Sequence, residues 1–350
     1  MRRAFTAAAA LALLPIFATA APAAAQEKEL LLFNWSNYMS PDLLKRFEAE
    51  TGIKVTLDTY DTNESMLAKL QAGGAGYDVV VPTGSFMQQM IRDGLLLKVD
   101  ANQMPNYKHV RKPFDDPNFD PHRAYSVPYM WGTTGLVYDT TKVAGGKIDD
   151  SWKELFEPRP DFVGKIGVLK DMGEVITAAA FYLGYDSCTE KPEEGQKILE
   201  LLEKQKPAVK IYSAEGTVDR VANGEVTMEH MWNGSFHRAH KKLPTIVYLY
   251  PREGVNLWGD NFAVPKGAKH VENAKLFLNW MMDPKNAAEA SNFTGYNNAI
   301  ADTEQYLKED LRNDPAFNTP EDMVARFRPV KECSKAALDL REKIWTRLLR

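Results

Sequence analysis

The sequence predicts a mixed α/β fold whose first half forms one doubly wound parallel sheet. Three short apolar segments, residues 29–34, 53–57 and 77–81, have the length and composition of buried strands. Helical segments stand between them, so the order is strand, helix, strand, helix, strand. Because such connections place successive strands side by side with one handedness, we expect the three strands to share one sheet.

The helices of this first half begin and end at residues with known preferences. Ser40-Pro41-Asp42 offers an N-cap, a proline at the first helical position and an acid in the first turn, and Gly52 ends that helix. A second helix is predicted from Asn63 to Ala72. A third follows Pro82-Thr83-Gly84-Ser85 and ends at Arg92.

Polar and aromatic side chains follow the carboxyl ends of two of these strands. Trp35 and Tyr38 come directly after the first strand, and Thr83 and Ser85 come after the third. Open α/β sheets bind ligands at this edge, so the four residues are candidates for one wall of a ligand pocket. The structural alternative is that the aromatics pack a strand–helix corner and that Thr83 or Ser85 caps the next helix.

The second half alternates strands and helices less regularly. An extended, Gly-flanked aromatic run at 125–135 could carry the chain from one lobe to another. The predicted strands are 136–138, 165–169, 209–212, a strand from 224 that ends at 231–235, and 246–250. The predicted helices are a short one opened by Ser151-Trp152 and then 175–183, 191–205, 218–223, 274–282, 285–291 and 336–349. Trp258-Gly259-Asp260-Asn261 is expected just before the apolar run 262–265, and Tyr296 in a turn.

Asp171 and Glu174 precede one of these helices with the spacing of a capping box. In that motif the first residue accepts a hydrogen bond from the helix N-terminus, and the acid three residues later reaches back to it. The functional alternative is that both carboxylates face a cleft and hold ammonium groups.

The N-terminus has the layout of a secretory signal peptide. Arg2-Arg3 is a short basic start, residues 7–19 are small and apolar, and Ala23-Ala24-Ala25 precedes Gln26. The apolar run is too short and too rich in alanine for a membrane span. We therefore expect residues 1–25 to be removed and the mature chain to act outside the cytoplasm, as a protein that does not span the membrane.

The overall charge argues against a nucleic-acid partner. With 43 basic and 47 acidic residues the formal net charge is −4, and without Arg2 and Arg3 it becomes 41 − 47 = −6. Phosphate binding needs clustered basic residues, whereas a mildly acidic chain is compatible with a small cation.

The chain has two cysteines, Cys188 and Cys333. In an exported protein this even number permits one disulfide, and the alternative is two separate thiols.

Motifs for catalysis are missing from the sequence, so we expect no enzyme and no cofactor. There is no Gly-x-Ser-x-Gly elbow, P-loop or Cys-x-x-Cys, and no nucleophile–base pair can be named for a secreted hydrolase. His230, His237 and His240, with Glu229, could ligate a metal ion, and the second and third share a helix face. The structural alternative, which the change from strand to helix favours, is that they are surface histidines.

One combination of residues recurs along the chain: an aromatic near the end of an extended run, with an acid close by. The aromatics are Trp35, Tyr38, Trp232, Trp258 and Tyr296, and the acids are Asp171, Glu174 and Asp260. Aromatic faces cover methylene groups and attract cations, and carboxylates bind ammonium groups. A cationic, methylene-rich ligand would suit this set, although such aromatics are also common in protein cores.

The order and spacing of several segments resemble the periplasmic polyamine-binding proteins of ABC importers, which bind spermidine or putrescine. The most specific segments are 34–38 (NWSNY), 51–55 (TGIKV), 77–82 (YDVVVP), 128–132 (PYMWG), 232–235 (WNGS) and 295–296 (GY). The resemblance implies a two-lobe, type II-like binding protein, each lobe a mainly parallel sheet flanked by helices, with the ligand cleft at the hinge. The implied lobes are 26–133 with 261–302, and 134–260 with 303–350.

The resemblance also implies a site and partners. The ligand-binding residues would be Trp35, Ser36, Tyr38, Thr83, Ser85, Asp171, Glu174, Trp232, Trp258, Asp260 and Tyr296. The expected partners are a polyamine and permease subunits with a cytoplasmic ATPase, around a monomer in the periplasm. A relative of this fold that binds a metal ion through the three histidines is the alternative.

The choice of polyamine stays open. The pair Asp171 and Glu174, with Trp258 before Asp260, looks like the spermidine binders, whereas Ser85 and the dipeptide 35–36 look like the putrescine binders. Asn37 stands where both kinds usually carry an acid, and the family's C-terminal polar contact falls near Arg328. Three acids favour a triamine, because each buried ammonium needs a partner.

Overall fold

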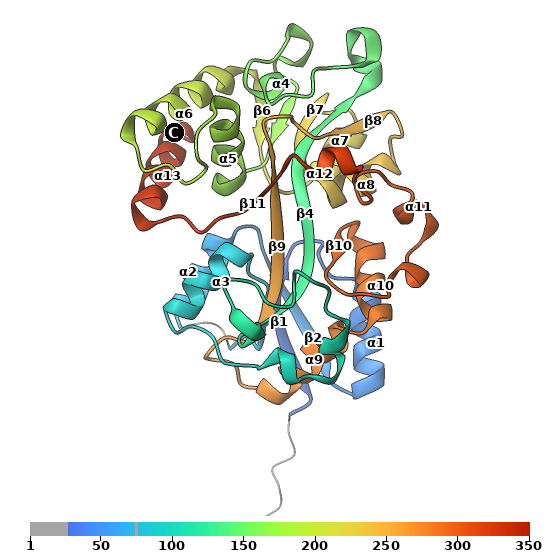
Figure 1. Cartoon of the computed structure of the whole chain (residues 1–350). Helices are drawn as coiled ribbons and strands as arrows, with labels where there is room; N and C mark the ends of the chain where they lie inside the picture. The colour runs from blue at the N-terminus through green and yellow to red at the C-terminus, as the bar shows by residue number, and fades with distance from the viewer. Residues whose placement is uncertain (1–26, 74–75) are drawn as a thin grey trace, which may run out of the picture.

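The computed structural model describes residues 27–73 and 76–350, which form two lobes joined by long strands (Figure 1). The predicted signal peptide lies outside the described residues, so it stays a prediction. Among the residues described, no helix is long and apolar enough to cross a membrane. The two-lobe α/β architecture agrees with the fold class expected from the sequence.

The described strands join into one curled sheet that runs through both lobes. Its order is β2-β1-β3-β9-β4-β7-β5-β6, with β8 and β10 also paired to β4 and β11 paired to β9. The strands are β1 Glu29–Trp35, β2 Lys54–Tyr60, β3 Val79–Val80, β4 Ser126–Asp139, β5 Ile166–Val168, β6 Val209–Tyr212, β7 Met228–Trp232, β8 Ile246–Leu249, β9 Val255–Ala263, β10 Asn297–Asn298 and β11 Phe327–Pro329.

Helices cover the sheet in both lobes (Figure 1). The first lobe carries α1 Pro41–Thr51, α2 Asn63–Gln71, α3 Gly84–Arg92, α9 Val271–Met281 and α10 Pro284–Thr294. The second carries α4 Lys153–Phe156, α5 Met172–Leu183, α6 Pro192–Gln205, α7 Thr217–Ala222, α8 Asn233–His240, α11 Glu309–Arg312, α12 Glu321–Val324 and α13 Lys335–Leu348. The longer helices lie where the sequence predicts them.

The start of the chain folds as predicted, because its local signals agree with its packing. β1 lies between β2 and β3 and is parallel to both. The Ser40 side chain caps α1 by accepting a hydrogen bond from the backbone N–H of Leu43, and Gly52 ends it with a left-handed φ of 72°. The carboxyl ends of β1 and β3 therefore point to the same edge, where Trp35 ends β1, and Tyr38 and Thr83 follow the two strands.

Two antiparallel strands, β4 and β9, carry the sheet from one lobe to the other (Figure 1). The sequence predicts a separate strand at 136–138, but β4 is one strand of 14 residues, which spans about 45 Å at 3.3 Å per residue. The sequence also places Trp258 and Asp260 before an apolar run, but both lie inside β9. The predicted lobe limits at 133/134 and 260/261 fall within these two strands and stay a prediction.

The two lobes have separate cores. Phe47, Phe262 and Phe277 are fully buried at the centre of one cluster, which also contains Tyr38, Trp258 and Tyr296. Trp152 and Phe162 are fully buried in the other. Three of the aromatic side chains expected at the ligand site, Tyr38, Trp258 and Tyr296, are therefore also part of the first lobe's core.

A disulfide joins Cys188 to Cys333 across 145 positions of sequence. It ties the loop after α5 to the segment before α13. The structure thus selects the disulfide over two separate thiols.

Candidate functional site

A cavity of about 1320 Å³ opens between the two lobes. Side chains from β1, α2 and α3 of the first lobe line it, together with side chains from α5, α7, α8 and α13 of the second and from β9. All eleven residues that the sequence nominates reach it: Trp35, Ser36, Tyr38, Thr83, Ser85, Asp171, Glu174, Trp232, Trp258, Asp260 and Tyr296. The volume exceeds that of most drug-sized sites, so the cavity has room for an extended ligand.

Asp260 is a buried carboxylate held by hydroxyl groups. Its Oδ2 accepts a 2.8 Å hydrogen bond from the Tyr38 hydroxyl, and its Oδ1 accepts one of 2.7 Å from Thr83 Oγ1. Burial of its side chain raises the pKa of Asp260 to about 7. None of the ion pairs within residues 27–73 and 76–350 includes Asp260, so in this cavity its charge lacks a cationic partner.

Thr83 does not use its side chain to cap the next helix, which was the structural alternative to a role in the pocket. It does occupy the N-cap position of α3, but in the described chain its side chain makes no capping hydrogen bond. The hydroxyl instead binds Asp260 and accepts a 3.0 Å hydrogen bond from Asn63 Nδ2. Thr83 thereby orients the acid of the cavity.

Asp171 and Glu174 perform a structural role and face the cavity at the same time. Asp171 caps α5 by accepting a 2.9 Å hydrogen bond from the Glu174 N–H, as the capping box predicts. The Glu174 side chain does not complete the box, because its Oε2 accepts a 2.7 Å bond from Asn256 and its Oε1 a long, 3.4 Å bond from Trp232 Nε1. Burial, and then the neighbouring Asp171, raise the pKa of Glu174 to about 7.

Tyr296 contacts two other aromatic side chains of the cavity edge to face. The ring centroid of Tyr296 lies 5.4 Å from that of Tyr38 and 5.1 Å from that of Trp258. Trp35 donates its indole N–H to Val81 O at 2.9 Å, which fixes its ring at the end of β1. The two interpretations of Trp35 and Tyr38 are therefore compatible, since both pack the corner and line the cavity.

Strand β9 places its side chains in alternation along the cavity. Asn256, Trp258 and Asp260 lie two residues apart and share one face of the strand. Asn256 holds Glu174, so one acid lies at each end of this row with the Trp258 ring between them. Such a row can bind two amino groups while the indole covers the carbon chain between them.

Two glycines let the rings of Trp258 and Tyr296 approach the backbone. A Cβ on Gly132 would come within 2.7 Å of Trp258 Cζ2, and a Cβ on Gly234 would overlap the ring of Tyr296. The aromatic surface of the cavity therefore depends on these residues having no side chain.

The remaining nominated residues contribute less. The exposed Ser36 makes a long, 3.4 Å bond to Asp61, and Ser85 lies in the first turn of α3. Asn37 lines the cavity with a left-handed φ of 57°. Arg328 lies on β11, where its guanidinium bonds the carbonyls of Ala325 and Phe327, and it is not one of the residues that line the cavity.

Sequence reasoning missed several residues of the site: Tyr60, Asn63, Glu64, Asn256 and Arg341. The alternation of side chains on β9 could have found Asn256, since it lies on the same face as Trp258 and Asp260. The others reach the cavity through contacts between distant segments, for which the sequence carries no local signal.

Of the three histidines, His230 and His237 are buried and His240 is half-buried, and within the described residues they do not converge on a metal site. His230 is fully buried, its ring nitrogens have no partner among the residues described, and burial lowers its pKa to about 3. His237 Nδ1 lies 2.6 Å from Asp314 Oδ2, and His240 Nδ1 lies 3.0 Å from Ile246 O. Glu229 forms a buried ion pair with Arg220. The metal-binding alternative is therefore not favoured.

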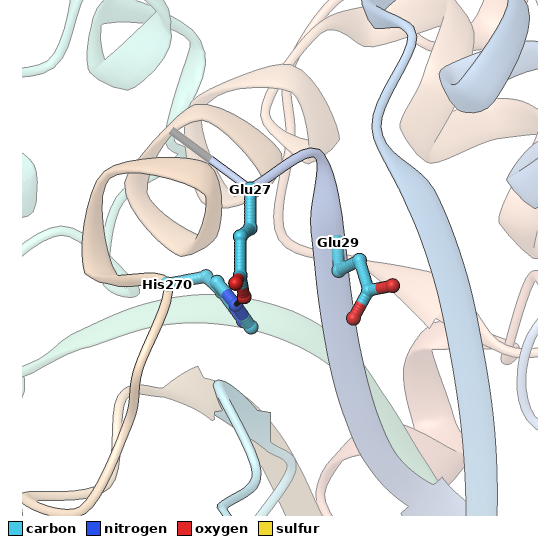
Figure 2. Close-up of side chains that lie close together, drawn as sticks. All are labelled: Glu27, Glu29 and His270. Carbon is cyan, nitrogen blue, oxygen red and sulfur yellow. Dashed lines mark hydrogen bonds and ion pairs between the residues drawn. The ribbon is translucent and has the colours of Figure 1, made fainter. Parts of the chain in front are cut away.

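In the described chain, the one group with spacing suited to a metal ion is Glu27, Glu29 and His270, far from the histidines named above (Figure 2). His270 Nε2 lies 3.1 Å from Glu27 Oε2, and Nδ1 lies 2.9 Å from Asp78 Oδ2. The hydrogen bond to Asp78, and then that to Glu27, raise the pKa of His270. When His270 is protonated, its two ring nitrogens donate to Glu27 and Asp78 and leave no lone pair for a metal ion, so this geometry suits an ion-paired cluster.

Comparison with known proteins identifies the family. A model described as bacterial extracellular solute-binding protein matches residues 42–319, well over half of the chain. The chain belongs to this family. Solute-binding proteins serve transport and are not enzymes, in agreement with the expectation from the sequence.

Relatives of this solute-binding protein carry names that specify their ligands. The putrescine-binding periplasmic protein SpuD of Pseudomonas aeruginosa (strain UCBPP-PA14) is 34% identical over 345 residues, which cover 93% of each chain. The spermidine/putrescine-binding periplasmic protein of Escherichia coli (strain K12) is 32% identical over 81% of each chain. The solved structure of a putative spermidine/putrescine ABC transporter from Listeria monocytogenes superposes with a TM-score of 0.86, at 30% identity, over 92% of this chain and 99% of that one.

Proposed function

We propose that the protein binds a linear polyamine, putrescine or spermidine, between its lobes and delivers it to an ABC-type permease. The observation that carries this proposal is Asp260, a buried carboxylate in the cleft that is fixed by two hydroxyls and has no cationic partner among the described residues. A ligand ammonium would supply the missing charge through charge-assisted hydrogen bonds.

The rest of the cleft supports the same ligand class. Glu174 offers a second carboxylate beyond the Trp258 ring. A carbon chain with an amino group at each end matches this order of acid, aromatic and acid. Each aromatic face contributes about 0.5–2 kcal/mol of cation–π attraction to an ammonium nearby. The names of the relatives point in the same direction.

Transport would follow from closure of the lobes on the ligand. Asp260, which is bonded to Tyr38 of the first lobe, would bind the ligand from that side, and Glu174 and Trp232 would bind it from the second lobe. A ligand that contacts both lobes stabilises their closed arrangement, which the permease subunits, driven by a cytoplasmic ATPase, would recognise. We place the mature protein in the periplasm as a monomer, after removal of residues 1–25.

Calorimetric titration of the mature protein, freed of bound ligand, tests the proposal. The panel is putrescine, spermidine, spermine and agmatine, with a neutral diol of the same length as putrescine as the control. We expect saturable binding of at least one polyamine with one site per chain and no binding of the diol. Absence of heat and of a thermal shift with every amine would refute the proposed function.

A further inference from the structure

Arg341 is a buried cation in the wall of the proposed polyamine site. It lies on α13, its side chain is 7% exposed, and it lines the cavity. Its Nη2 donates to Gly173 O at 2.8 Å and to Thr177 Oγ1 at 3.1 Å, which lie in the first two turns of α5. The guanidinium therefore holds the turn that carries Asp171 and Glu174.

The other end of the same guanidinium contacts the disulfide loop. Nη1 donates to Ser187 O at 2.8 Å, and Cys333 Sγ lies 3.5 Å from it. Ser187 precedes Cys188, so the disulfide between Cys188 and Cys333 fixes two of the four groups that Arg341 contacts. One planar side chain thus connects α13, the disulfide and the N-terminus of α5.

Three acidic side chains surround Arg341, which explains how a cation can lie in a site proposed to bind cations. Asp171 and Glu174 face it from α5, and Glu64 faces it from α2 in the opposite lobe. Lys331 and Glu332, which also line the cavity, are paired with Asp186 and Arg92. Burial raises the pKa of Asp171 and of Glu64, and the charge of Arg341 acts in the opposite direction on both.

We propose that Arg341 is a positioning residue, which holds the Asp171–Glu174 turn in place and balances its acidic charge while the cleft is empty. This inference rests on the proposed function. Arg341 acts on the ligand through the two acids, and the disulfide keeps Arg341 in its position. A lysine would retain the positive charge, but it lacks the planar guanidinium whose two terminal nitrogens bind two segments of the chain at once.

The test uses variants of the whole mature chain in which Arg341 is changed to Gln or to Lys. Arg347→Gln, on the exposed face of the same helix and paired with Glu203, is the matched control. We expect R341Q to lower the affinity for putrescine and spermidine roughly tenfold or more, in line with the loss of hydrogen bonds to a charged group. R341K should recover part of this loss, and R347Q should bind as the parent does.

Two further readouts separate positioning from general stability. In ligand-free protein, ¹³C NMR of carboxyl groups should show Asp171 titrating at higher pH in R341Q than in the parent, and unchanged in R347Q. The double variant C188S/C333S should lower affinity and shift this titration in the same direction as R341Q but by less, because Arg341 keeps its charge and loses its fixed position. Thermal unfolding shows whether each variant is folded.

Each outcome decides a separate point. R341Q that binds like the parent, or that loses affinity with no change in the titration of Asp171, overturns the proposed role of Arg341. Parent-like binding by C188S/C333S overturns the part assigned to the disulfide. A parent protein that binds no polyamine refutes the function itself and the inference with it.

Discussion

The Tyr38 hydroxyl donates a 2.8 Å hydrogen bond to the carboxylate of Asp260, 222 positions further along the chain. Tyr38 follows β1, Asp260 lies in β9, and Thr83 binds the second carboxylate oxygen. The acid is therefore oriented by the fold of the first lobe before any ligand arrives. Such preorganisation reduces the ordering that binding would otherwise require.

Replacement of Asp260 by Ala should weaken polyamine binding more than replacement of Trp35 by Ala. Loss of one partner of a buried charge pair costs about 2–5 kcal/mol, whereas loss of one aromatic face costs about 0.5–2 kcal/mol. Calorimetry of both variants measures the difference. Asp42→Ala, at an acid whose side chain is 84% exposed on α1, is the control. An Asp260→Ala protein with the affinity of the parent would remove Asp260 from the site.

Binding should depend on pH near neutrality. Burial raises the pKa values of Asp260 and Glu174 to about 7, and a cationic ligand binds their ionised forms. Affinity should therefore fall as the pH drops from 8 to 6, and binding at pH 7 should release protons. Titrations in buffers of different ionisation enthalpy measure that release, and binding without any change in protonation would contradict these assignments.

The raised pKa values of the same acids should make the ligand-free protein less stable as pH rises, whereas polyamine affinity increases with pH. A carboxyl group whose pKa is raised in the folded state binds more protons there than in the unfolded state. Its contribution to the free energy of unfolding therefore falls as pH rises from its unfolded pKa toward 7. Ligand-free Asp260→Asn should therefore be more stable than the parent at pH 8, and this gain in stability should be smaller at pH 5. Thermal unfolding at the two pH values checks this, and a difference that does not vary with pH would contradict it.

Replacement of Gly234 by Ala should impair binding, because the new methyl group would overlap the ring of Tyr296. The ring must move, and with it the aromatic contacts to Tyr38 and Trp258. Gly267→Ala is the control, since among the described atoms a Cβ there meets nothing within 4 Å. Equal affinity of the two variants, measured by calorimetry, would show that the position of Tyr296 does not matter.

His270 should stabilise the first lobe at acidic and neutral pH only. Its folded pKa is raised by Asp78 and Glu27, so its stabilisation is complete below the unfolded pKa and is lost as pH rises through the folded one. His270→Gln should therefore be more destabilising at pH 6 than at pH 9 in urea unfolding. His240→Gln, at a ring that bonds the backbone of Ile246, is the comparison. An equal loss at both pH values would argue against the ion-paired cluster.

Local signals in the sequence predicted much of the first lobe, and all eleven residues nominated from the sequence line the cavity. Ser40 and Gly52 limit α1 as expected, and Trp35 and Tyr38 lie at the strand edge where ligands bind. These features depend on residues close in sequence, and parallel strands share one carboxyl edge. The predicted acids also line the cavity, although the sequence placed Asp260 just before an apolar run, and the structure places it within β9.

Other features depend on contacts between distant segments. Thr83 can cap a helix or bind an acid, and only the arrival of β9, 177 positions later, decides between them. His237 is buried with Asp314, 77 positions away, as its partner, and Arg341 reaches the cleft from α13. The length of β4 likewise follows from the strands of both lobes that pair with it. No local pattern marks any of these.

The central claim is that a polyamine lies between the lobes with its amino groups on Asp260 and Glu174. A crystal structure of the mature protein with putrescine or spermidine tests it most directly. We predict an amino nitrogen at about 2.7–2.9 Å from a carboxylate oxygen of each acid, with the carbon chain against Trp258. A ligand bound outside the cleft, or in it without contact to Asp260, would contradict the account.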